Sequence, residues 1–167
     1  MKVQRAPLIV GALIAGVGTA GLVRAAIAQP PAPSAAASAT GPIVVTNAYV
    51  RQPVPPSHTA AAYFTIYNTT TSTDRLLSVE TGAGATAVLH ATNRNGSMTV
   101  TPSGTVIRAH AKLVLAPGHG HVMIQHVYGT LSPGQHVNLE LDFQRAGPVH
   151  VVARVISYLA PIPGGGH

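Results

Sequence analysis

The stretch Val137-Asn138-Leu139-Glu140-Leu141-Asp142-Phe143 decides the fold class of this chain. Its apolar residues alternate strictly with polar or acidic ones, so that the two kinds would fall on opposite sides of an extended strand. The pattern predicts a β-strand with one face against a core and the other in water. No segment after residue 41 repeats apolar residues at the spacing of an amphipathic helix. We therefore expect an all-β domain with little helix.

Short β-branched runs continue on both sides of this stretch, separated by Gly, Pro, Asn and Asp. Pro55-Pro56-Ser57, Asn95-Gly96 and Ser132-Pro133-Gly134 are typical turn sequences. The expected strands are residues 43–51, 60–67, 76–81, 86–91, 98–101, 105–110, 112–115, 121–127, 136–143 and 149–157. Many short strands joined by regular turns favour a Greek-key β-sandwich or barrel.

The N-terminus has the three parts of a secretory signal peptide. Lys2 and Arg5 precede an apolar run over residues 6–23, and Ala26-Ile27-Ala28 supplies small residues for cleavage. The run is 18 residues long and rich in Gly and Ala, which is the lower limit for a membrane span. We expect residues 1–28 to be cleaved and the protein to be exported, with an uncleaved membrane anchor as the alternative.

The rest of the chain divides into a linker, one domain and a tail. Residues 29–41 are small and Pro-rich without periodicity, which is typical of a tether. Residues 42–158 hold all the expected strands, and the 139 residues after the signal are enough for one ordinary domain. Residues 159–167 are rich in Gly and Pro, and we expect them to form a flexible tail.

Composition argues against several classes of function. Once residues 1–28 are removed, 7 Lys and Arg stand against 4 Asp and Glu, and the basic residues are scattered singly. Nucleic acid is therefore not an expected partner. The chain has no Cys, so we expect no disulfide, no lipid-modified thiol and no thiolate centre of the blue-copper type. It contains no G-x-S-x-G, Walker or H-E-x-x-H motif, and four scattered acids do not favour a catalytic pair, so we expect no enzyme.

Methionine is scarce, and both internal methionines follow a histidine closely. Met98 comes after His90, and Met123 ends the triplet His121-Val122-Met123. A thioether sulfur and an imidazole nitrogen together favour copper(I), since soft neutral ligands select the soft monovalent ion. On a strand, residues 121 and 123 share one side while Val122 faces the core. A single methionine is more often core filling, but its pairing with histidine in both cases favours a metal site.

We expect four side chains to gather at one rim of the domain and hold one copper(I) ion. They are His90, Met98, His121 and Met123. This shell is neutral, and none of the four acidic residues adjoins it in sequence, so a divalent ion there would lack compensating carboxylates. Binding should weaken at low pH, because a protonated imidazole cannot ligate a metal.

The chain resembles the PCuAC family of periplasmic copper(I) chaperones over nearly all of residues 42–157. The similarity is carried by residues 47–51, 61–68, 74–77, 117–123, 131–134 and 139–147, of which the His-x-Met after Pro117-Gly118 is the most specific. The resemblance implies a cupredoxin-like β-barrel whose copper(I) ligands map onto the same two histidines and two methionines. It also implies delivery of copper towards the dinuclear copper centre of a cytochrome oxidase, with the oxidase copper subunit or a thiol-bearing assembly protein as partner.

The spacing of the motif departs from the family pattern. Only seven residues separate His90 from Met98, fewer than in the family, and another placement of the gap would align Val100 with the family's methionine. Positions 98 and 100 share strand parity, so the Met98 sulfur would still lie on the same face. His119 stands where the family has Gly and is an additional or competing imidazole, whereas His167 alone gives little support for a second site.

Two other classes of function stay open. His119-x-His121 in a β-rich exported chain is compatible with a His-rich copper oxidase or dismutase, although methionine ligands disfavour copper(II). A superoxide assay on copper(II)-loaded protein would decide that case. The other class is a metal-free β-sandwich module for adhesion or assembly, which a copper(I) titration against a chromogenic chelator would separate from a chaperone.

Overall fold

The computed structural model describes residues 41–92, 95 and 97–163, which form ten β-strands and no helix. The strands are β1 (Ile43–Arg51), β2 (Ala60–Asn68), β3 (Asp74–Thr81), β4 (Gly84–Thr92), β5 (Met98–Val100), β6 (Thr105–Ile107), β7 (Lys112–Leu115), β8 (Gly120–Val127), β9 (His136–Phe143) and β10 (Gly147–Ile156). The expected all-β class is therefore confirmed. The predicted signal peptide (residues 1–28), all but the last residue of the predicted linker (29–41) and His167 lie outside the described residues. Nowhere in the described ranges is there a helix long and apolar enough to cross a membrane.

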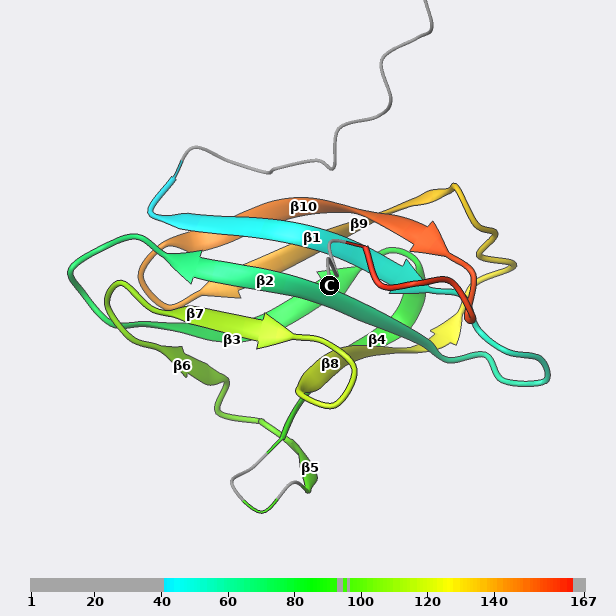
Figure 1. Ribbon diagram of the computed structural model, residues 1–167, viewed down its shortest axis with the longest axis horizontal. Helices are drawn as coiled ribbons and strands as arrows, with labels where there is room; N and C mark the ends of the chain where they lie inside the picture. Colours follow the sequence, from blue (N-terminus) through cyan, green and yellow to red (C-terminus); the bar gives the residue numbers. More distant parts are fainter. Residues whose placement is uncertain (1–40, 93–94, 96, 164–167) are drawn as a thin grey trace, which may run out of the picture. The chain divides into compact units, whose positions relative to one another are not determined.

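The ten strands form one sheet that curls around a single core (Figure 1). The strand order is β5-β4-β8-β2-β1-β10-β9-β3-β6, and β7 pairs with β2 beside this path. β1 and β10 are parallel, while the other pairs are antiparallel. Strand order thus differs from chain order, and it brings β8 between β4 and β2, which come much earlier in the sequence.

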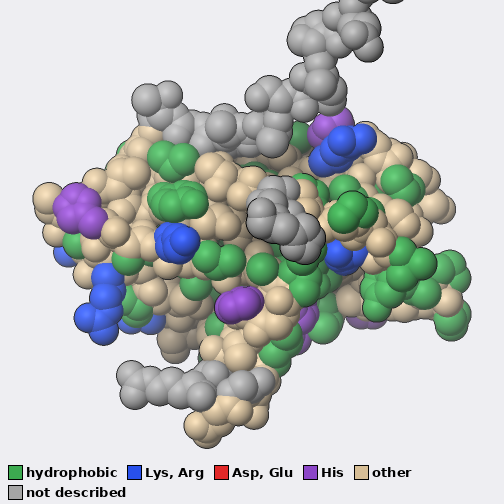
Figure 2. All heavy atoms as spheres, viewed as in Figure 1, with side chains coloured by type: hydrophobic (Ala, Val, Ile, Leu, Met, Phe, Trp, Pro, Cys, Tyr) green, Lys and Arg blue, Asp and Glu red, His purple; other side chains and the backbone are tan. Residues whose placement is uncertain are grey.

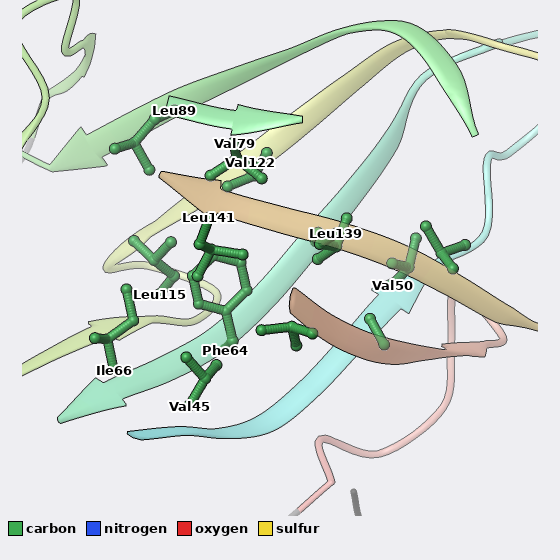
Figure 3. Packing of buried hydrophobic residues seen from close by; sticks show 14 of the residues in the cluster. Val45, Val50, Phe64, Ile66, Val79, Leu89, Leu115, Val122, Leu139 and Leu141 are labelled. Atoms are coloured by element: carbon green, nitrogen blue, oxygen red, sulfur yellow. The ribbon is translucent and has the colours of Figure 1, made fainter. Parts of the chain in front are cut away.

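Every strand except β5 contributes buried apolar side chains to the core. Phe64 of β2 packs among residues from several strands, including Leu115 of β7 and Leu141 of β9 (Figure 3). It is 1% exposed, and burial of a side chain of this kind stabilises a fold by about 1.5–3 kcal/mol. The apolar residues of β9 are all buried and its alternate residues face outward, as the alternation predicted.

Several strand ends differ from the prediction by one to three residues, and two of these differences lie beside residues with a left-handed backbone conformation. β6 ends at Ile107 rather than at residue 110, because His110 has a φ of 52° and its N–H bonds to the Thr70 carbonyl. A left-handed conformation departs from the extended backbone of a strand, and here no ladder pairing continues beyond Ile107. β10 begins at Gly147 rather than at residue 149, because Gly147, with a φ of 73°, closes a three-residue hairpin loop.

Asp74 at the start of β3 organises the loop between β9 and β10. Its Oδ1 accepts hydrogen bonds from the N–H groups of Arg75 (2.7 Å) and Arg145 (2.9 Å), and its Oδ2 accepts one from the N–H of Ala146 (3.0 Å). The carboxylate is buried, with 6% of the residue exposed. These bonds satisfy three backbone donors in a place where water does not reach them freely.

Candidate metal centre

His90 and His121 lie opposite each other on neighbouring strands. The register of β4 and β8 pairs their Cα positions, and the two ring centroids are 5.1 Å apart with an interplanar angle of 54°. Their chain neighbours Leu89 and Val122 are buried in the core, so both imidazoles lie on the outer face of the sheet. The sequence predicted that these histidines come together at one rim, and the pairing of β4 with β8 does this.

Met123 lies on the same outer face, two residues along β8 from His121. Its strand partners are Val88 on β4 and Ala61 on β2, and the side chain is half-buried. The sulfur has a polar neighbour, because Gln125 Nε2 donates to Met123 Sδ over 3.6 Å. Thr86 in turn donates from its hydroxyl to Gln125 Oε1 over 3.1 Å, which orients the amide. Two imidazoles and one thioether therefore occupy adjacent positions of one surface.

Met98 is not in the same row as the two histidines. On β5, Val100 is the strand partner of His90, while Met98 is the partner of Thr92. Met98 therefore shares the outer face but sits diagonally from His90, and it is 45% exposed. Diagonal neighbours across an antiparallel pair are about 7–8 Å apart, which a long side chain can span. Met123 and Met98 therefore lie in the rows on either side of the two histidines, Met123 on β8 itself and Met98 diagonally from His90 on β5.

A row of aromatic rings continues from the histidines towards β1, and sequence reasoning missed it. The Tyr63 ring on β2 lies beside His121 with centroids 6.1 Å apart, and Tyr49 on β1 stacks on Tyr63 at 5.1 Å. Tyr49 and Tyr63 are strand partners and are 3% and 9% exposed, respectively. Alternation with the buried Ala62 and Phe64 places Tyr63 on the outer face, but strand order decides which ring it meets.

A pocket of about 270 Å³ adjoins the candidate ligands. His121, Met123 and Tyr63 form part of its wall, together with Arg51 at the end of β1 and Tyr158 beyond the end of β10. The remaining lining comes mainly from the β1–β2 connection. Space for an incoming group therefore exists beside the imidazole and the thioether.

The electrostatic surroundings of the site disfavour a positively charged imidazole. Burial, followed by the nearby His90, lowers the pKa of His121. No acidic side chain lines the pocket or is a strand partner of His90, His121 or Met123 in the described part of the chain. The exposed or half-exposed acids lie on β3 and β9, and the face over β1 and β2 shows His, Lys and Arg but no Asp or Glu (Figure 2).

The other histidines of the described region do not line the pocket beside this centre. His119 is exposed in the turn before β8, and His58 lines a separate pocket of about 430 Å³ beside the Pro-rich β1–β2 connection. His150 Nδ1 lies 3.6 Å from Glu140 Oε2 on an exposed surface. Over residues 41–92, 95 and 97–163, no three His, Cys, Asp or Glu side chains cluster as a metal site.

The fold is similar to that of solved PCuAC domains. The copper-bound PCuAC domain from PmoF2 gives a TM-score of 0.64 at 21% identity, covering 73% of this chain and 98% of that domain. The apo PCuAC domain from PmoF1 gives 0.65 at 23% identity, with 73% and 99% covered. The solution structure of CuI-DR1885 from Deinococcus radiodurans gives 0.56 at 24% identity, with 74% and 80% covered. At these identities, the likeness establishes a shared fold.

Family membership rests on a separate comparison. No curated protein sequence matches the chain at a significant level. The profile of the LpqE-like family, whose description names a lipoprotein, matches residues 43–155. The match covers well over half of the chain and spans β1 to β9 and nearly all of β10, with His90, Met98, His121 and Met123 inside it. This chain belongs to the LpqE-like family.

Proposed function

We propose that this protein is a copper(I) chaperone that binds one ion on the outer face of β4 and β8. The observation that carries the proposal is the direct pairing of His90 with His121, with Met123 two residues along the same face. Two neutral imidazoles and a thioether are a soft donor set, and they suit copper(I) better than zinc or a hard divalent cation. The absence of any carboxylate among the pocket-lining residues supports the same choice of ion.

The protonation state of the candidate ligands also suits copper(I) binding. A metal ligand must offer a free lone pair, and the lowered pKa of His121 favours its neutral form. The Met123 thioether is not protonated at physiological pH and cannot form a disulfide, so it remains a ligand in a compartment that oxidises thiols. We assign His90, His121 and Met123 as the main ligands and Met98 as a fourth ligand that reaches in from the neighbouring row.

We further propose that the protein acts in the periplasm and passes copper towards the dinuclear centre of a cytochrome oxidase. In this scheme residues 1–28 are the export signal, residues 29–41 a tether and residues 42–158 the copper-carrying domain. A half-exposed shell of neutral ligands allows a partner to replace them one at a time. Thiolates of the oxidase copper subunit or of an assembly protein are softer and anionic, so transfer to them is downhill. The role is that of a carrier rather than an enzyme.

A copper(I) titration in competition with a chromogenic chelator tests the binding claim. The parent protein should bind one equivalent, and His121→Ala and Met123→Ala should lose tight binding while keeping the thermal unfolding midpoint of the parent. His136→Ala, at the exposed start of β9, serves as the matched control and should bind like the parent. Copper(I) binding by His121→Ala and Met123→Ala equal to that of the parent would contradict the assignment of these two residues as ligands. Fast superoxide turnover by copper(II)-loaded protein would instead point to the enzyme alternative.

A further inference from the structure

Tyr49 and Tyr63 are buried although they lie on the outer face of the sheet. Their neighbours Val50, Ala62 and Phe64 point into the core, and neither tyrosine belongs to the core cluster. The two rings stack on each other, and the second one meets His121. Something other than the core must therefore shield these rings from water.

Residues 157–160, here called the C-terminal strap, return along this face after β10 ends. Arg51 holds the strap through its guanidinium group. Its Nη1 donates to the carbonyls of Ser157 (3.4 Å) and Tyr158, and its Nη2 donates to the carbonyl of Ala160 (3.0 Å). In Figure 1 the red segment that follows β10 turns back towards β1. One fork of donors bound to three backbone acceptors is a geometry that arginine provides and lysine does not.

The strap reaches the candidate metal centre through Tyr158. This side chain lines the same pocket as Tyr63, His121 and Met123, and Arg51 lines it too. Tyr158 is the residue through which the strap contributes to the pocket wall, beside the β1–β2 connection that supplies much of the remaining lining. The opposite side of the ligands is formed by β5, whose three residues are all exposed.

We infer that Arg51 and the strap are positioning elements of the proposed copper site, holding Tyr63 and Tyr158 beside His121 and limiting ligand exchange from the β1–β2 side. The inference rests on the proposed function. A partner's sulfur ligands would then approach from the β5 side, where Met98 and Val100 are exposed. Loss of the strap would leave the copper ligands in place but would open a second route to the ion.

The rate at which a chromogenic chelator removes copper(I) from the loaded full chain tests this inference. Tyr158→Ala removes a pocket wall, and Arg51→Ala releases the strap, so both should release copper about tenfold faster than the parent. Tyr158→Phe retains the ring and should restore slow release. Arg51→Lys should release copper at a rate close to that of Arg51→Ala, because one ammonium group cannot bond three carbonyls in this geometry.

Tyr128→Ala is the matched control, because Tyr128 is also an exposed tyrosine at 64% but does not line this pocket. It should release copper at the parental rate. If Arg51→Ala lowers the unfolding midpoint, the copper release rate of Tyr158→Ala alone tests the inference. Tyr158 is 54% exposed and lies outside the core cluster, so its truncation removes no core contact. Parental release rates for Tyr158→Ala would overturn the inference while leaving copper binding intact. Failure of the parent to bind copper(I) at all would instead overturn the proposed function.

Discussion

Val100, not Met98, lies directly opposite His90 across the β4–β5 pair. Because His90 is in turn the strand partner of His121, these three side chains form one row across β5, β4 and β8. Met98 occupies the next row, opposite Thr92. The row of the two imidazoles therefore ends in a valine, at a position where a sulfur ligand would face them directly.

Val100→Met should strengthen copper(I) binding. A thioether at position 100 would stand in the row of His90 and His121 and supply a soft donor without reorganisation of β5. We expect affinity to increase about tenfold, equivalent to about 1.4 kcal/mol, in a chelator competition assay. Thr99→Met adds the same side chain to the opposite face of β5 and should bind copper like the parent. Equal affinities for the two variants would mean that β5 contributes nothing to the shell.

Met98→Ala should cost much less affinity than Met123→Ala. Met123 lies on the same strand and face as His121, whereas Met98 must reach diagonally from an exposed position. We expect losses of about 100-fold for Met123→Ala and of no more than about tenfold for Met98→Ala, measured by the same competition. A larger loss of affinity for Met98→Ala than for Met123→Ala would show that β5 moves in the copper-loaded protein and carries the principal sulfur ligand.

The stability of the metal-free protein should fall as the pH drops below about 6.5. Burial and His90 lower the pKa of His121 in the folded state, so the unfolded chain takes up the proton first. The contribution of neutral His121 is therefore complete above the unfolded pKa and is lost as the pH falls from there through the folded pKa. Urea unfolding on both sides of pH ~6.5 measures the slope. His121→Asn should flatten it, and an unchanged slope in that variant would assign the effect to other groups.

Asp74→Ala should destabilise the fold without weakening copper(I) binding. The substitution leaves the backbone N–H groups of Arg75, Arg145 and Ala146 without their carboxylate acceptor. We expect a loss of about 3 kcal/mol in the free energy of unfolding, measured by urea denaturation. Asp142→Ala, at a half-exposed position on β9, should change stability by no more than about 0.5 kcal/mol. A loss of copper affinity in Asp74→Ala at temperatures where it is fully folded would contradict this separation.

Much of the fold was predictable because strands and turns are encoded by consecutive residues. The alternation in β9 and the turn residues between the other strands gave all ten strands, with errors confined to their ends. The boundary errors at His110 and Gly147 come from left-handed backbone conformations, which side-chain periodicity does not report. The placement of His121 and Met123 on one face, with Val122 in the core, followed from strand parity alone and is confirmed as geometry.

The sequence by itself determined the donor atoms available to a metal and the parity that puts them on one side of a strand. Only the tertiary structure decided which donors meet, because strand order and register depend on pairings between segments far apart in the chain. The pairing of β4 with β8 brought His90 to His121, and the pairing of β4 with β5 put Val100 where a methionine was expected. Other long-range contacts attach the C-terminal strap to Arg51 and place Tyr158 in the same pocket as Tyr63, and no local pattern carries that information.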